Sequence, residues 1–430
     1  MRRTAANRSL LAVMPSEPPP APSEASAVHS GPLLRHPPFL AFFATRTLSR
    51  FAGQIASVAV GWQLYEITGS AFVLGIAGLI QFLPTALLVF VAGGAADRYE
   101  RRRVMQLCQA ADGVTAAVLA AASLGGFLSA PTIFAALAVF GTAGAFESPA
   151  AAALLPATAP QGQLQQATAV WTAGGQVATI TGPALGGLAY ALSPAVPYVM
   201  MTAFWLAAAA LTGLLRVAPV ARPDLAEQPT PGALFEGVRF VRSNPTILGT
   251  ISLDLFAVLL GGAAALLPIY ARDILHTGPW GLGVLRAAPA VGALAMTLVL
   301  ARVPLRRRVG MRMFQAVIAF GAATVVFALS QWLWLSLAAL AAMGAADTVS
   351  VVIRFSLVQL ATPDAMRGRV GAVNFLFINA SNQLGDFESG MVAALVGAVP
   401  AAVIGGLGTI AVALLWMKLF PSLRHVEKLQ

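Results

Sequence analysis

Long apolar segments separated by short polar loops follow one another along the chain from residue 42 to residue 420. A helix needs about 20 mostly apolar residues to cross the hydrocarbon core of a bilayer. By that criterion we expect an all-α membrane protein with twelve transmembrane helices, at residues 42–65, 71–93, 104–124, 132–153, 167–191, 196–216, 247–270, 281–302, 313–330, 333–353, 370–397 and 399–420.

One long polar interruption, residues 218–245, divides the apolar segments into two groups of six. We therefore predict an N-terminal six-helix bundle at 39–217, a cytoplasmic linker at 218–245, a C-terminal bundle at 246–420 and a cytoplasmic tail at 421–430. Within the linker, Gly232 to Arg242 places apolar residues at helical spacing, which predicts an amphipathic helix at the membrane surface. Residues 1–38 are rich in proline, so we expect a disordered cytoplasmic tail and no cleaved signal peptide.

An internal repeat relates the two groups of helices. The segment at 154–160 aligns with 357–363 at an offset of 203 residues, and both segments end in proline. The same offset places Gly182 on Gly385 and Gly187 on Gly390 in the segments that follow. The repeat predicts that the fifth and eleventh helices are structural counterparts in two pseudo-symmetric bundles.

The composition excludes a soluble globular protein. Apolar residues make up 58% of the chain and charged residues 10%, where soluble domains have about 45–50% and about 25%. The net charge of +10 does not indicate nucleic-acid binding, because the arginines lie at the ends of apolar segments. If the N-terminus is cytoplasmic, Arg272 is the only basic residue in an outer loop. The positive-inside rule then places both termini in the cytoplasm, in a multi-pass protein of the cytoplasmic (inner) membrane. Cys108 is the only cysteine, which excludes an intrachain disulfide and a cysteine metal cluster.

A short, strongly charged loop, GGAADRYERRR, lies between the second and third predicted helices at residues 93–103. Its pattern G-x-x-x-D-R-x-x-R-R resembles the corresponding loop of major facilitator superfamily transporters. The resemblance implies the major facilitator fold, alternating access, and a cytoplasmic gating loop in which Asp97 binds a helix N-terminus or an arginine such as Arg367 or Arg369. The residues that carry this motif are Gly93, Gly94, Asp97, Arg98, Arg101 and Arg102.

Two further segments resemble exporters of that superfamily. The fifth predicted helix contains Gly182, Pro183, Gly186 and Gly187, in a pattern similar to the antiporter motif of drug:proton antiporters. The fourth lacks the arginine that those antiporters usually carry there. Instead, residues 146–156 resemble the subfamily of enterobactin-type siderophore exporters and macrolide efflux proteins. That likeness extends over residues 40–420 and implies export.

Ionisable residues inside the predicted helices are candidates for function, because a charge at mid-bilayer costs at least about 2.5–3.5 kcal/mol. The proton-coupling candidates are Asp254, Asp347, Asp386 and Glu388. For Glu147 and Asp112 we favour an interfacial or helix-packing role instead.

Polar faces of two predicted helices indicate a substrate cavity. In the eleventh helix, Asn379, Asn382 and Gln383 share one face with Asp386, opposite a second stripe at Asn374, Ser381 and Glu388. In the first, Arg46, Arg50, Gln54, Ser57 and Gly61 share a face. The cavity candidates are Arg50, Gln54, Asn379, Asn382 and Gln383. We expect Arg46 to extend to the cytoplasmic surface, whereas Arg50 either does the same, binds an anionic substrate or pairs with a carboxylate.

The leading hypothesis is a secondary active transporter that exports a small, partly apolar molecule such as a siderophore, antibiotic or drug. We expect it to be a monomer. It would use the proton gradient and need neither a cofactor nor a metal, with the substrate and the lipid bilayer as partners. Uptake by symport and a non-transporting receptor or scaffold remain alternatives. An enzyme is disfavoured, because no nucleophile–base or metal-binding set is found within the apolar segments.

Overall fold

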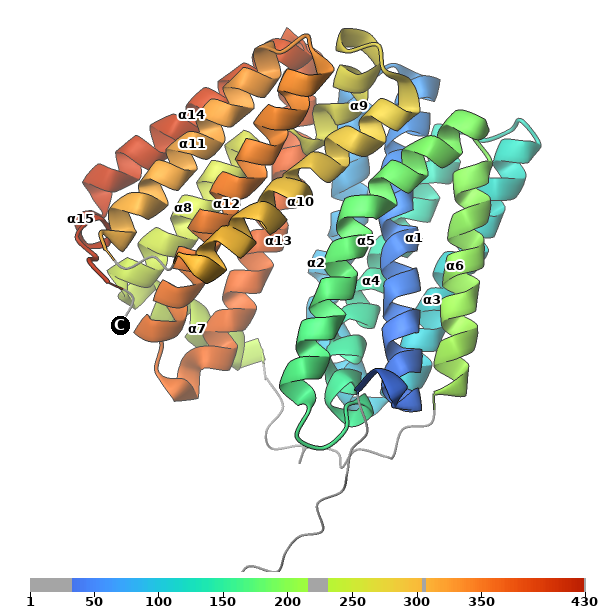
Figure 1. Cartoon of the computed structure of the whole chain (residues 1–430), viewed down its shortest axis with the longest axis horizontal. Coiled ribbons are helices and arrows are strands. Elements are labelled where there is room, and N and C mark those ends of the chain that lie inside the picture. Colours follow the sequence, from blue (N-terminus) through green and yellow to red (C-terminus); the bar gives the residue numbers. More distant parts are fainter. Residues whose placement is uncertain (1–32, 216–230, 304–306, 429–430) are drawn as a thin grey trace, which may run out of the picture.

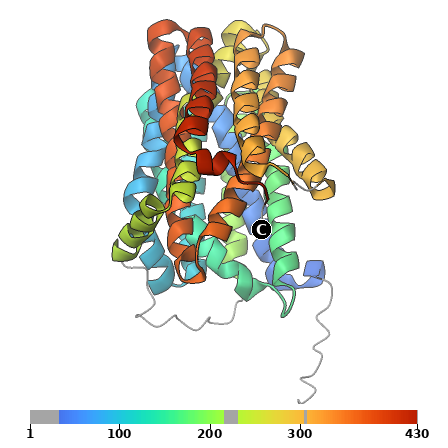
Figure 2. The same cartoon turned by 90° about the vertical axis from the view of Figure 1, so that its left-hand side faces the viewer.

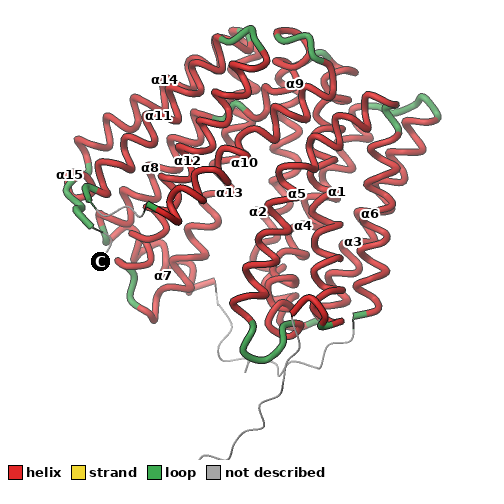
Figure 3. The backbone as a smooth tube through the Cα atoms, in the orientation of Figure 1, coloured by secondary structure: helices red, strands yellow, loops and turns green. Residues whose placement is uncertain are grey.

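The computed structural model describes residues 33–215, 231–303 and 307–428, and within these ranges every regular element is helical (Figure 3). The elements are η1 (Leu33–Arg35), α1 (Pro37–Thr68), α2 (Ala71–Arg98), α3 (Arg101–Leu124), α4 (Ala130–Thr158), α5 (Leu164–Leu192), α6 (Val196–Leu214), α7 (Pro231–Ser243), α8 (Pro245–Gly261), η3 (Ala264–Leu266), α9 (Leu267–Ile269), the π-helical turn η4 (Tyr270–Ile274), α10 (Gly278–Arg302), α11 (Val309–Leu329), α12 (Leu333–Ala361), η5 (Asp364–Met366), α13 (Arg367–Val396), α14 (Ala398–Leu419) and α15 (Pro421–Arg424).

Several helices extend beyond the predicted apolar segments. The charged loop at 93–103 is much shorter than expected, because α2 continues to Arg98 and α3 begins at Arg101. The predicted seventh helix is not continuous but breaks after Gly261 into η3, α9 and η4. At the break, a Cβ on Gly262 would lie 3.0 Å from the backbone of Gly385 in α13. Close packing against a second helix therefore accompanies the interruption.

Nine helices within the described ranges are long and apolar enough to cross a membrane. Three other long helices, α1, α5 and α13, do not meet the criterion although each has at least 29 residues. They carry the polar stripes and glycine motifs of the sequence, and so fewer of their positions suit lipid. The count of twelve spans stays a prediction.

The long helices form two groups that lie closest near α9 and diverge toward α7 (Figure 1). Helices α1 to α6 pack on one another, as do α8 and α10 to α14. The short helix α7 lies against α8 and α13, with Val241 buried between them. At the end near α9, one apolar core runs across both groups, whereas at the other end each group has its own core. Figure 2 shows the helices running side by side along the height of the molecule.

Two helix crossings at which glycines let the backbones approach closely join the groups. We call these two crossings the seam. At one crossing, a Cβ on Gly187 of α5 would lie 2.5 Å from the carbonyl oxygen of Pro279 in α10. At the other, a Cβ on Gly390 of α13 would lie 2.7 Å from the Cα of Gly75 in α2. Glycine lets two backbones approach this closely. Because Gly187 and Gly390 differ by the 203-residue offset, the structure confirms that α5 and α13 are counterparts.

The other glycines of the motif in α5 pack inside the first group of helices. A Cβ on Gly182 would lie 2.6 Å from the Cβ of Gln54, and one on Gly186 would lie 3.1 Å from the Cα of Ile55, both in α1. Gly385, which the 203-residue offset matches with Gly182, packs on the backbone of α8. The motif therefore serves two contacts, with one face of α5 against α1 and the other against α10.

Polar contacts supplement the seam at the end near α9. The hydroxyl group of Tyr65, near the end of α1, donates to the carboxylate of Asp273 in η4. Arg272 donates to the carbonyl oxygen of Tyr65 at 3.3 Å, and its guanidinium lies 5.5 Å from the centre of the Tyr65 ring. Along the seam, Gln176 of α5 donates to the carbonyl oxygen of Ala290 at 3.3 Å. The two groups are thus tied at one end.

A side chain at the α5–α10 crossing should open the seam. Overpacking costs about 1–3 kcal/mol, so Gly187→Leu should raise the accessibility of the cavity from the α9 side by roughly tenfold. The measurement is the labelling rate of Ser57→Cys, in a Cys108→Ser background, by a membrane-impermeant maleimide applied from that side. Gly175→Leu is the matched control, because nothing lies within 4 Å of that position of the same helix. Equal rates in the two variants would contradict the role of the crossing.

Candidate functional site

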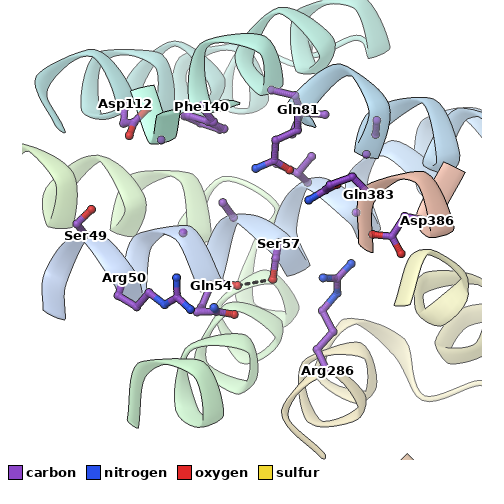
Figure 4. Close-up of a pocket in the computed structure, with 18 of the residues that line it drawn as sticks. Ser49, Arg50, Gln54, Ser57, Gln81, Asp112, Phe140, Arg286, Gln383 and Asp386 are labelled. Carbon is purple, nitrogen blue, oxygen red and sulfur yellow. Dashed lines mark hydrogen bonds between the residues drawn. The ribbon is translucent and has the colours of Figure 1, made fainter. Parts of the chain in front are cut away.

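A cavity of about 460 Å³ lies between the two groups of helices, next to the seam (Figure 4). The first group contributes residues of α1, α2, α3, α4 and α6 to its wall, and the second contributes η3, α9, α10 and α13. The apolar part of the wall includes Leu137, Phe140 and Trp205. A volume in the range of about 300–1,000 Å³ is typical of sites for small molecules.

Helix α1 forms the polar side of the first group in this cavity. The predicted cavity residues Arg50 and Gln54 line it, together with Ser57 and with Gln81 of α2. No carboxylate of the described residues lies within salt-bridge distance of Arg50. Its guanidinium is directed along α1 toward Gln54 (Figure 4). Arg50 therefore offers a fixed positive charge that a bound molecule can use.

The second group places opposite charges on the facing wall. Arg286 of α10 points into the cavity toward Asp386 of α13, which lies beside Gln383 (Figure 4). A Cβ on Gly61 of α1 would lie 3.6 Å from the Arg286 guanidinium, and one on Gly78 of α2 would lie 3.4 Å from the Asp386 Cβ. Arg286 and Asp386 thus both lie next to helices of the first group, beside the seam.

A buried ion pair joins α1 and α4 within the first group. Arg46 Nη1 lies 2.5 Å from Glu147 Oε1, and the two side chains are 14% and 10% exposed. The same oxygen accepts from Ser49 Oγ and from Gln109 Nε2, each at 2.9 Å. The prediction that Arg46 extends to the cytoplasmic surface is therefore wrong, because Glu147 provides a partner for it inside the bundle.

A second buried ion pair joins α8 and α12. Arg354 contacts the carboxylate of Asp254, and its Nη2 lies 3.6 Å from Asp347 Oδ1. The Arg354 and Asp254 side chains are only 10% and 11% exposed, whereas Asp347 is 45% exposed. Two of the predicted proton-coupling candidates are therefore held by one arginine.

The two ion pairs join corresponding helices of the two groups, with their charges reversed. Arg46 stands nine residues after the first residue of α1, and Asp254 stands nine residues after the first residue of α8. The 203-residue offset matches Glu147 with Ser350, one helical turn before Arg354. The first and fourth helices of each group are thus joined by an ion pair, with the cation on α1 in one group and on α12 in the other.

Comparison with known proteins shows which family this chain belongs to. The model for transmembrane secretion effectors, a family of the major facilitator superfamily, matches residues 29–429. The chain belongs to this family. It is a membrane transporter and not an enzyme.

Among its curated relatives, the enterobactin exporter EntS of Citrobacter koseri is 28% identical over 404 residues, covering 92% of this chain and 95% of the relative. EntS of Escherichia coli K12 is 26% identical with the same coverage. Solved transporters share the fold alone. The nucleoside transporter NupG has a TM-score of 0.71 at 14% identity, covering 89% of this chain and 100% of that one. A bacterial homologue of ferroportin, in an inward-facing state, has a TM-score of 0.68 at 17% identity, covering 92% and 100%.

The other predicted site residues of this transporter lie outside the cavity wall. Asn379 and Asn382 donate to carbonyl oxygens of their own helix, at 2.8 and 3.0 Å. They stand nearer the start of α13, where the helices diverge, and so only Gln383 and Asp386 of the predicted stripe line the cavity. The Glu388 carboxylate accepts from Ser389 at 3.4 Å and is not in that wall either.

The arginines of the predicted gating loop hold the transporter's first group together. Arg102 pairs with Glu100 at 3.0 Å and donates to the carbonyl oxygen of Leu215, beyond the end of α6, at 2.9 Å. Arg101 donates to the carbonyl oxygen of Ala153 in α4 at 3.2 Å. Arg98, at the end of α2, is exposed. A Cβ on Gly94 would meet nothing within 4 Å, and the side-chain surroundings of Gly93 and Asp97 lie outside the described residues.

Each of the two arginines predicted as partners of Asp97 pairs with a different carboxylate. Arg369 lies 2.6 Å from Glu236 of α7, and Arg367 lies 2.9 Å from Asp364. The latch between Asp97 and one of these arginines stays a prediction. The described residues contain no group of three or more histidine, cysteine, aspartate or glutamate side chains that is suited to a metal ion.

Sequence reasoning did not assign a site role to Arg286 and Arg354. Arg286 lies inside the predicted eighth span, and the rule that selected the intramembrane carboxylates selects an arginine there equally well. Arg354 directly follows the predicted tenth helix, which ends at residue 353, whereas α12 continues to Ala361. Its neighbour Asp254 is 100 residues earlier in the chain, and no local pattern relates the two.

Removing one partner of a buried ion pair should destabilise the transporter. Because Arg354→Met leaves Asp254 buried without its cation, we expect a loss of about 3–5 kcal/mol and a clear fall in the unfolding temperature in detergent. The double variant Arg354→Gln with Asp254→Asn should recover at least half of that fall. Arg367→Gln is the control, since its pair with Asp364 is exposed. A double variant as unstable as Arg354→Met would contradict the pairing.

Proposed function

We propose that this protein exports a small, partly apolar molecule across the cytoplasmic membrane by alternating access, with the proton gradient as its energy source. The observation that carries the proposal is the cavity of about 460 Å³ between two helix groups that are tied at one end. A site between two such groups opens to either side of the membrane as they rock.

The direction of transport is inferred from the relatives. The curated relatives are named enterobactin exporters, and the family is described as secretion effectors. A siderophore of the enterobactin kind is therefore the first substrate class to test. The wall of the cavity suits such a ligand, because Phe140 and Trp205 supply apolar contacts while Arg50 and Arg286 supply fixed positive charge.

The distribution of arginines supports the orientation. The cluster at 101–103 lies at the start of α3, and Arg239 and Arg242 lie in α7, at the end where the helix groups diverge. By the positive-inside rule this end faces the cytoplasm. The seam and Arg272 then lie on the outer side, and the cavity is in an inward-facing state in which an exporter loads its substrate.

The proton site of the proposal is Asp386. Its Cβ lies next to Gly78 of α2, and the carboxyl group lines the cavity opposite Arg286. When the seam opens, α2 moves away from α13 and Asp386 becomes accessible from outside. When the seam closes, Asp386 faces the cavity again. A proton taken up outside is then released inside, and its charge changes the relative free energies of the two states.

Transport by purified protein in liposomes tests this function, with enterobactin as the probe and a pH indicator inside. Outward-directed enterobactin flux should raise the inward proton flux, and a protonophore should abolish uphill transport. Accumulation of the probe against the predicted direction would favour symport instead. No flux of either species, with correctly inserted protein, would favour a non-transporting receptor.

Asp386→Asn separates coupling from binding. Asparagine fills the same space but cannot carry the proton charge, so proton-driven export should fall by about tenfold or more, while exchange of enterobactin across the membrane stays near the wild-type rate. Asp364→Asn is the matched control, because that carboxylate is 87% exposed and lies away from the cavity. Unchanged driven transport in Asp386→Asn would remove this residue from the coupling mechanism.

A further inference from the structure

Asp112 is a buried carboxyl group that has no role in the proposed transport by way of Asp386. It lies in the middle of α3, is 4% exposed, and its Oδ1 has no hydrogen-bond partner. No cation of the described residues lies within salt-bridge distance of it. The residue nevertheless lines the cavity, at the end occupied by Ser49 and Arg50 (Figure 4). An ionised carboxylate in such surroundings is strongly disfavoured unless it is paired.

The elements packed around Asp112 supply no positive charge that is free to compensate it. Helix α4 faces it with the carboxylate of Glu147, which adds a like charge. Its own helix contributes Cys108 and Gln109, and the Gln109 amide is used by Glu147 and Thr212. From α6, Trp205 in the cavity wall carries no charge. Helix α1 contributes Arg46, which is paired with Glu147, and Arg50, which is directed elsewhere.

The same wall contains a hydrogen-bond donor without a partner, the Nε of Arg46. Arg46 binds Glu147 through Nη1, whereas its buried Nε has no hydrogen-bond partner. Glu147 Oε1 already accepts from three side chains. If Asp112 lost its proton, two carboxylates would compete for one guanidinium. The negative charge of Asp112 would then attract Arg46.

We propose that Asp112 binds a transported proton, and that Asp112, Glu147 and Arg46 form a second proton site in the first helix group. In the state described here Asp112 is protonated and neutral, and Arg46 belongs to Glu147. On release, the proton passes to water in the cavity and the Asp112 carboxylate accepts from Arg46. The coupling part of this inference rests on the proposed function, whereas the protonation of Asp112 does not.

Helix α1 links this site to the seam. Arg46 lies near one end of α1, and Tyr65, which contacts Arg272 and Asp273 across the seam, lies near the other. A shift of Arg46 between Glu147 and Asp112 therefore acts on the helix whose far end ties the two groups together. A proton at Asp112 biases the same two states as a proton at Asp386, from the opposite side of the cavity.

Infrared spectroscopy of the purified protein, without substrate, tests the protonation directly. The C=O stretching band of a protonated carboxyl group is separate from the bands of ionised carboxylates and shifts in heavy water. Asp112→Asn should remove one such band at neutral pH and keep the unfolding temperature near that of the wild type, because asparagine resembles the neutral acid. Asp364→Asn should remove none. A spectrum of Asp112→Asn identical to the wild type would overturn the proposal.

Proton counterflow in enterobactin-loaded liposomes tests the coupling. Asp112→Asn should lower the number of protons moved per enterobactin to about half or less, while unenergised exchange of the probe continues. A wild-type protein that moves enterobactin without protons would refute proton coupling as a whole and leave the infrared result standing. Wild-type coupling with an unchanged ratio in Asp112→Asn would refute only the second proton site.

Discussion

A charged side chain inside a bilayer needs a partner or access to water, and this requirement organises the interior of the transporter. It explains why the three long helices that fail the apolarity criterion, α1, α5 and α13, lie at the cavity and the seam. It also explains the reversed ion pairs. Arg46 with Glu147 and Asp254 with Arg354 fix the first helix of each group to the fourth. Arg50, Arg286 and Asp386, which lie outside these two pairs, line the cavity together with Asp112.

In the proposed mechanism, the seam is the contact that opens and closes. Its crossings are close backbone contacts at glycines, next to the apolar core that both groups share at this end. The polar contacts of Tyr65 with Arg272 and Asp273 can exchange for water at the surface. Asp386 lies beside one crossing, and α1 joins the Asp112 site to the other end of the seam. In the proposed mechanism, protonation of either carboxyl group acts where the two states differ, which is the condition for coupling.

The sequence was sufficient for the fold and for part of the site. Apolar length predicted the helices, and the 203-residue repeat predicted that α5 and α13 are counterparts. Of the residues that helical spacing selected for the cavity, Arg50, Gln54 and Gln383 lie in its wall. The break in α8 was missed, because glycine in an apolar run does not reveal the helix that packs on it. Asn379 and Asn382 share a face with Asp386, but the helices have diverged where they lie. The partners of Arg46 and Arg354 are 101 and 100 residues distant in sequence, so only tertiary packing identifies them.

The central claim is that the two helix groups exchange the end at which they touch. Spin labels in a Cys108→Ser background measure this most directly, with one pair at Gln161 and Asp364 on the α7 side and one at Leu192 and Trp332 on the α9 side, all at exposed positions. On lowering the pH or adding enterobactin, the first distance should shorten in the same fraction of molecules in which the second lengthens. Two distances that stay single, or that change in the same direction, would contradict the account.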